Sequence, residues 1–144
     1  MKVFTKSEGE PTSVAKVGQV IESGNWSYQV TNVDRQKEVP GLFGSKTEAK
    51  GIWAAVHLKL KNIGKQTYPI NAHDFEVKDV QGITFKADTV TSGTYNRNLK
   101  LVPLGDQLPP GVEVESAVLF DVNPQTTGLQ LWLVQARMTI DFGT

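Results

Sequence analysis

Apolar and polar residues alternate along much of the chain, with the period of two that is typical of half-buried β-strands. The segment IWAAVHLKLKN at residues 52–62 places Ala54, Val56, Leu58 and Leu60 on one face and Trp53, Ala55, His57 and Lys59 on the other. The segment VEVESAVLFDV at residues 112–122 places Val112, Val114, Val118, Phe120 and Val122 opposite Glu113, Glu115 and Asp121. Each segment is therefore predicted to form a strand with one face in a core.

The C-terminal segment shows the same alternation in two parts that are out of phase. Leu129, Leu131 and Leu133 share one face, and the pattern resumes with Ala136, Met138, Ile140 and Phe142. A β-bulge near residues 134–135 would explain the slip, so we predict one long final strand. Shorter runs at residues 17–21, 26–30, 75–77 and 83–85 bring the expected number of strands to seven or eight.

No window shows a sustained helical stripe, and the turn-forming residues lie between the predicted strands, as at Gly24-Asn25, Gln81-Gly82 and Pro109-Pro110-Gly111. This pattern predicts an all-β sandwich. Two connections are long, QKEVPGLFGSKTEAK at residues 36–50 and DTVTSGTYNRNLKLVPLGDQL at residues 88–108. Long loops in a compact domain are usually functional or disordered.

Three segments carry a resemblance to a known family: VGQVIESGNWSYQVTNV, then AVHLKLKNIGKQTYPINAHDFEVKDVQGITFKAD, then LPPGVEVESAVLFDV. They resemble the Ig-like family of bacterial secreted and lipoprotein domains of unknown function, which is related to mycobacterial secreted immunoprotective antigens. The resemblance implies an Ig-like antiparallel β-sandwich of seven or eight strands, here without a disulfide. It implies no catalytic residues. It also implies a secreted or envelope-anchored protein, so we expect a signal or anchor to have been removed ahead of Met1.

The composition narrows the possible partners. The 144 residues fit one domain, which we place at residues 14–144 after a flexible tether at residues 1–13. Fifteen basic residues balance fifteen acidic ones without a basic cluster, so we expect no nucleic-acid partner. There is no cysteine for a disulfide or a thiolate-metal site, and no apolar run long enough to span a membrane. We expect no cofactor.

The two histidines raise the question of a metal or catalytic site. His73 lies among Asn71, Asp74 and Asp79, residue types that also form turns, and we predict that they serve as turn residues. His57 lies on the polar face of its strand, so a joint metal site is not expected. No nucleophile motif is present, and Glu113 and Glu115 are interpreted as solubilising charges on an exposed face. The chain is therefore predicted not to be an enzyme.

Three tryptophans could supply stacking surfaces for a sugar. Trp26 is predicted to lie in the core, while Trp53 and Trp132 fall opposite the main apolar row of their strands. We favour a covering loop that buries Trp53 and Trp132. The alternative is a carbohydrate-binding module in which these two residues form an exposed platform.

The two long loops hold candidate anchors for a protein partner. Leu42 and Phe43 lie between glycines in the first loop, and Tyr95 and Arg97 lie in the second. Large apolar, aromatic and guanidinium groups contribute most when they are desolvated at an interface. The alternative is that these side chains fold back onto the sandwich. We predict a non-enzymatic, extracytoplasmic interaction module that uses both loops to bind an envelope or extracellular protein.

Overall fold

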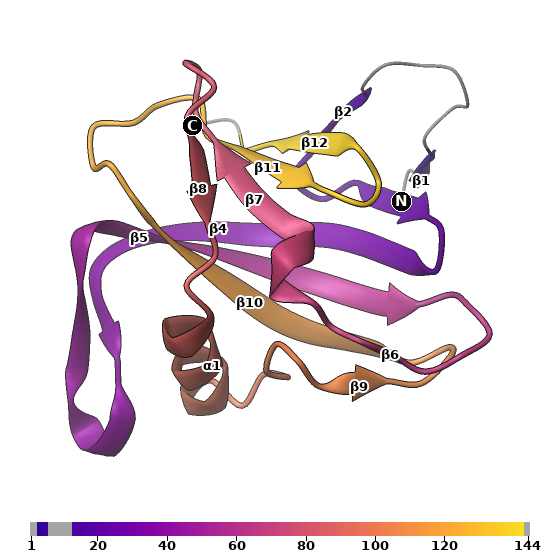
Figure 1. Cartoon of the computed structure of the whole chain (residues 1–144), viewed down its shortest axis with the longest axis horizontal. Coiled ribbons are helices and arrows are strands. Elements are labelled where there is room, and N and C mark those ends of the chain that lie inside the picture. Colours follow the sequence, from indigo (N-terminus) through magenta and orange to yellow (C-terminus); the bar gives the residue numbers. More distant parts are fainter. Residues whose placement is uncertain (1–2, 6–12, 143–144) are drawn as a thin grey trace.

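A computed structural model of the chain describes residues 3–5 and 13–142, which form two packed β-sheets (Figure 1). The first sheet has the order β1-β3-β4-β5-β10 and the second has the order β2-β12-β11-β7-β8. The first sheet contains β1 (Val3–Thr5), β3 (Val20–Ser23), β4 (Trp26–Pro40), β5 (Lys46–Asn62) and β10 (Glu113–Val122). The second contains β2 (Ser13–Lys16), β7 (Phe75–Lys78), β8 (Thr84–Lys86), β11 (Gln130–Leu133) and β12 (Met138–Asp141).

The predicted β-sandwich is confirmed, with more strands than the seven or eight expected because short edge segments also pair. The pairings are antiparallel except β1 with β3 and β2 with β12. A short ribbon joins β6 (Tyr68–Pro69) to β9 (Gln107–Leu108). Of the predicted tether at residues 1–13, residues 1–2 and 6–12 lie outside the described part, while residues 3–5 form β1.

The main core lies between the two sheets. Leu58 of β5 and Phe120 of β10 are buried there, facing Leu131 and Ile140 of the second sheet. Tyr28 and Phe75 bridge the sheets edge to face, with ring centroids 6.1 Å apart. The alternation in the sequence therefore assigned the inward face of these strands correctly. Burial of such side chains is the main driving force for a sandwich of this kind.

The segment after Leu129 corrects the prediction of a single final strand. It forms a hairpin in which Leu133 pairs with Met138, and the turn at residues 134–137 reverses the chain. Arg137 has φ +54° in this turn. The phase slip in the sequence is therefore produced by a reversal and not by a bulge.

The segment after β8 corrects the prediction that residues 88–108 form a long loop. Residues Thr89–Asn98 form helix α1, which begins with the Asp88 carboxylate accepting a hydrogen bond from the Thr91 N–H at 2.9 Å. The helix and its flanks cover the free edge of β10. The Asn96 side chain bonds both backbone groups of Ala117, and Ser92 Oγ accepts from the Leu119 N–H. An edge strand covered in this way cannot pair with another chain.

A second buried cluster lies on the outer face of the first sheet, under α1. It contains Val39, Ala49, Trp53, Ala55, Tyr95, Ala117 and Leu119. The sequence pattern predicted that the face of β5 with Trp53, Ala55 and His57 is the more polar one. The structure shows that this face is also covered over part of its length. In the described part of the chain, no helix has the length and apolar composition that crossing a bilayer requires.

Candidate functional site

The expected loop at residues 36–50 is mostly a β-hairpin that extends β4 and β5 beyond the sandwich, at the lower left of Figure 1. We refer to residues 37–50 as the hairpin arm. Its strands pair at Glu38 with Glu48, Val39 with Thr47 and Pro40 with Lys46, so only residues 41–45 form a loop. This loop contains the short 3-10 turn η1 (Leu42–Gly44). The arm therefore has a defined direction set by its ladder of backbone hydrogen bonds.

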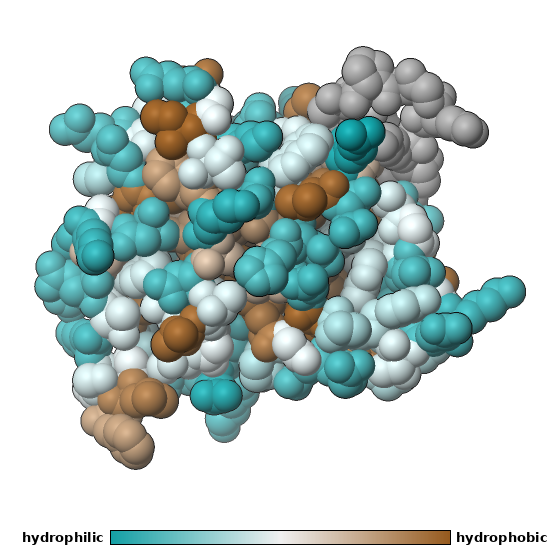
Figure 2. Space-filling model, in the orientation of Figure 1, coloured by the Kyte–Doolittle hydropathy of each residue, from teal (hydrophilic) through white to brown (hydrophobic). Residues whose placement is uncertain are grey.

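The tip of the arm presents two apolar side chains to solvent. Phe43 is fully exposed, at 103% of its reference surface, and Leu42 is 56% exposed. The brown atoms at the lower left of Figure 2 lie at this tip. Phe43 has φ +55°, in the left-handed region that bulky residues rarely occupy. Because the Phe43 ring is exposed and its backbone is strained, this residue does not stabilise the folded state.

Hydrogen bonds fix the shape of the tip. The Gly41 N–H donates to the Ser45 carbonyl at 2.8 Å, and Ser45 Oγ donates to the Leu42 carbonyl at 2.6 Å. From α1, the Asn98 side chain donates to the carbonyls of Pro40 and Gly41 at 3.2 and 3.3 Å. The end of the helix and the arm thus flank a surface hollow of about 250 Å³. The two segments predicted to act together do lie side by side.

The base of the arm is anchored in the outer cluster. Trp53 is buried, and its indole N–H donates to the Thr47 carbonyl at 3.1 Å. The Asp121 carboxylate accepts from the N–H groups of Lys50 and Gly51 at 2.9 and 2.8 Å. A Cβ on Gly51 would lie 2.0 Å from the Val122 carbonyl oxygen, so only glycine fits there. The arm is therefore attached to the sandwich at several points.

The anchors predicted in the second segment have different positions. Tyr95 is only 4% exposed, so the expectation of an exposed Tyr95 anchor is corrected: the ring packs under α1 against the sheet. Arg97 is exposed on the last turn of α1, next to Asn98. Among the four predicted anchors, Leu42, Phe43 and Arg97 are thus open to solvent. Asn98, which ties the helix to the arm, had no signal in the sequence, because the helix itself was not predicted.

Tyr95 takes part in a polar cluster on the outer face of the sheet. Its hydroxyl lies 2.9 Å from His57 Nε2, and that nitrogen lies 3.6 Å from the Asp34 carboxylate. Burial, and secondarily the charge of Asp34, raises the pKa of the Tyr95 hydroxyl. His57 therefore links strand β5 to helix α1. Among the described residues, the Thr31 hydroxyl donates to the His57 backbone carbonyl at 3.3 Å, and no serine or threonine hydroxyl bonds to the His57 ring.

The tryptophans do not form the platform that the carbohydrate alternative requires. Trp53 lies under the arm and α1, which confirms the favoured interpretation that it is covered. Trp132 is half-buried, and the Lys78 ammonium lies 4.7 Å from its ring centroid. Trp26 packs against the main core but keeps part of its surface exposed.

The stretch around His73 has the predicted turn function. Asn71 accepts a hydrogen bond from the His73 N–H at 3.0 Å and so caps the short turn η2 (Ala72–Asp74). Asp79 accepts from the N–H groups of Gln81 and Ile83, both at 2.9 Å. Within residues 3–5 and 13–142, no group of three or more histidine and carboxylate side chains is placed to hold a metal ion.

Solved structures with the same fold come from bacteria. The yjhA protein of Bacillus subtilis is 14% identical, with 89% of this chain and 99% of that chain covered and a TM-score of 0.66. An uncharacterized β-sandwich protein of Clostridium difficile is 12% identical, with 94% and 97% covered and a TM-score of 0.62. The secreted protein MPT63 of Mycobacterium tuberculosis is 12% identical, with 94% and 98% covered and a TM-score of 0.63.

No curated protein matches the sequence. A family model described as a domain of unknown function, DUF4352, matches residues 15–139, which is nearly the whole sandwich. This match agrees with the resemblance carried by the turn and strand pattern of residues 17–122. The chain belongs to the DUF4352 family.

Proposed function

We propose that this chain is a non-enzymatic, extracytoplasmic interaction module that binds a partner protein with the tip of its hairpin arm. The observation that carries this proposal is the fully exposed Phe43 ring at the end of an arm that is hydrogen-bonded along its length. The secreted relative MPT63 supports the extracytoplasmic location, since it has the same fold.

The arm has the properties of a preorganised binding element. Its turn is closed by internal hydrogen bonds and by Asn98, so little conformational entropy is lost when a partner covers it. Phe43 and Leu42 supply an apolar centre, and Lys46 and Glu38, 3.6 Å apart, supply a polar margin. Buried aromatic anchors surrounded by polar residues are the usual composition of interface hot spots.

Photo-crosslinking in cells that produce the protein tests the proposal. A photoreactive phenylalanine analogue replaces Phe43, and the same analogue at Val80 serves as control because Val80 is 72% exposed on a separate turn. We expect a discrete adduct with another protein from position 43 and none from position 80. An adduct of twice the mass of the chain would show contact with a second copy and contradict a separate partner.

The identified partner then allows a quantitative test. Phe43→Ala should weaken its affinity about thirtyfold, or about 2 kcal/mol, because the main apolar anchor is lost. The melting temperature should not change, because the ring is fully exposed. Binding equal to that of the wild type would disprove the role of the tip.

A further inference from the structure

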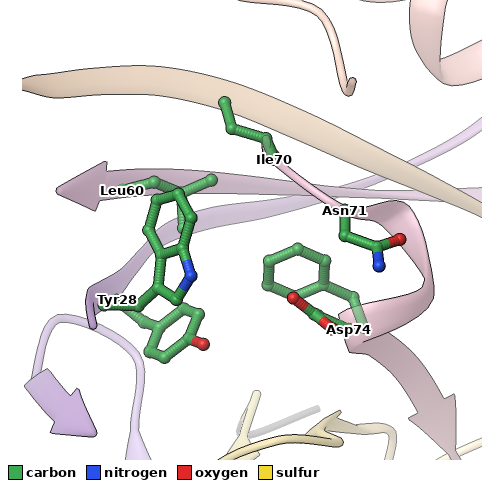
Figure 3. Close-up of a pocket in the computed structure, with 7 residues that line it drawn as sticks. Tyr28, Leu60, Ile70, Asn71 and Asp74 are labelled. Atoms are coloured by element: carbon green, nitrogen blue, oxygen red, sulfur yellow. The ribbon is translucent and has the colours of Figure 1, made fainter. Parts of the chain in front are cut away.

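A groove lies at the opposite end of β4 from the hairpin arm. It has a volume of about 340 Å³ and continues into a narrow cleft of about 10 Å³ between the two sheets. Trp26, Tyr28, Asn71 and Asp74 line both the groove and the cleft. Figure 3 shows the narrow cleft, with Tyr28 and Asp74 on either side of it and the phenol oxygen and the carboxylate directed into it.

Three polar groups in this groove have no hydrogen-bond partner among the described residues. They are the indole N–H of Trp26, the hydroxyl of Tyr28 and the carboxylate of Asp74. Among the described residues, no fully buried side-chain nitrogen or oxygen lacks a hydrogen-bond partner. The Tyr28 ring is 2% exposed, and its hydroxyl belongs to the small part of the side chain that is open to the groove, where it can bond to water or to a ligand.

The pKa values of Asp74 and Tyr28 are both raised, as expected for acidic groups that no neighbouring donor stabilises in their charged form. Burial raises the pKa of Asp74, an effect that the charge of His73 partly opposes. Burial, with a contribution from Asp74, also raises the pKa of the Tyr28 hydroxyl well above its usual range. Tyr28 therefore remains a neutral hydroxyl at all physiological pH values, able to donate one hydrogen bond and to accept others.

The lining residues restrict the chemistry of a ligand. Among the described residues that line the groove, Asp74 is the only charged one, with no lysine or arginine beside it. An anion would be repelled by Asp74, and an apolar ligand would leave all three polar groups unpaired at a cost. An organic cation would pair with Asp74 and could donate to the Tyr28 hydroxyl, but it would leave the Trp26 N–H, which can only donate, without an acceptor.

A ligand rich in hydroxyl groups satisfies all three groups together. Each hydroxyl can accept a hydrogen bond from Trp26 or Tyr28 and donate one to Asp74. Tyr68, with Trp26, adds aromatic surface to the same groove, and Gln135 adds an amide at its margin. The volume lies at the lower end of the range of about 300–1,000 Å³ for small-ligand sites, which suits a single ring.

We propose that this groove binds a neutral sugar ring, either as a free monosaccharide or as one unit of a glycan. The site is separate from the hairpin arm, so it goes beyond the proposed interaction with a partner protein. It also differs from the Trp53 and Trp132 platform, because its aromatic residues are Trp26, Tyr28 and Tyr68.

Titration followed by NMR tests the site in the intact chain. The indole N–H of Trp26 gives its own resonance, which Trp26→Phe identifies, and the other two tryptophans serve as internal references. Glucose, galactose, mannose and N-acetylglucosamine are added to about 50 mM, enough to saturate a site with a Kd near 1 mM. At least one of these sugars should shift the Trp26 resonance saturably. If an N-acetylglucosamine oligomer binds more tightly than its monomer, the groove recognises one unit of a glycan. If the two bind with equal affinity, the groove recognises a free monosaccharide.

Two variants separate binding in the groove from binding elsewhere. Tyr28→Phe removes only the unpaired hydroxyl and should weaken sugar affinity about tenfold, while the fold is kept. Tyr95→Phe removes a hydroxyl from the opposite face of the sheet and should leave the affinity unchanged. The proposal is overturned if no sugar gives a saturable shift, if Tyr28→Phe binds like the wild type, or if butylammonium saturates the site and the sugars do not.

Discussion

The two faces of the β1-β3-β4-β5-β10 sheet are both buried in part, but by different means. The inner face packs against the second sheet through large apolar side chains such as Leu58 and Phe120. The outer face is covered over part of its length by α1 and the base of the hairpin arm. There the sheet contributes Trp53 and Leu119 beside the small residues Ala55 and Ala117, and polar bonds from Asn96 and His57 join it to the helix.

This difference indicates a division of tasks within the fold. The inner face requires volume and apolarity, which many sequences can supply. The outer face requires particular donors and acceptors, because α1 satisfies the free backbone groups of β10 with its own side chains. We infer that the inner core supplies most of the stability. The outer cluster orients the arm.

The largest effect should come from the inner face. Phe120→Ala should lower the free energy of unfolding by about 2 to 5 kcal/mol, because it removes a completely buried ring and leaves a cavity between the sheets. Urea denaturation measures this change, with Val90→Ala as the control because Val90 is 80% exposed. A loss below about 0.5 kcal/mol would mean that the inner face does not dominate stability.

A smaller but more local effect is expected on the outer face. Asn96→Ala should cost about 1 to 3 kcal/mol, because the buried N–H and carbonyl of Ala117 both lose their partner. Exchange of the Ala117 amide hydrogen should accelerate as well. Asn98→Ala, on the same helix, is the matched control: its bonds of 3.2 and 3.3 Å lie nearer to solvent, so it should cost less. If both substitutions lowered the free energy of unfolding equally, the hydrogen bonds of Asn96 to the edge of β10 would not be more important for stability than those of Asn98.

The smallest effect concerns the polar end of the inner core. The pKa of Asp74 is raised above its ordinary 3.8, so the folded state binds the proton more tightly than the unfolded state does. Relative to Asp74→Asn, the wild type should therefore lose stability as the pH rises through this raised pKa. Denaturation of both proteins across that pH range measures the difference, which solvent near Asp74 keeps small. A difference of opposite sign would show that the carboxylate has a stabilising partner.

Some elements could be predicted from the sequence because their causes are local. A strand with one face in a core needs apolar residues at every second position, and Ala54, Val56 and Leu58 meet that condition whatever covers them. Turns also depend on near neighbours, as the bonds from Asn71 to His73 and from Asp79 to Gln81 show. The β-sandwich and the turn function of the His73 stretch are thus properties of the sequence itself.

Other features depended on contacts between distant segments. Helix α1 has no apolar stripe, because its inward side chains Ser92 and Asn96 bond to a strand edge rather than to a core. The hairpin at residues 134–137 lacks a glycine or proline signal and uses Arg137 at φ +54°. Only the tertiary structure shows that Tyr95 is buried and Phe43 exposed, since the burial of each ring depends on which distant segment lies over it. The periodicity of the sequence determined the strands, and the packing of the chain decided which side chains face solvent.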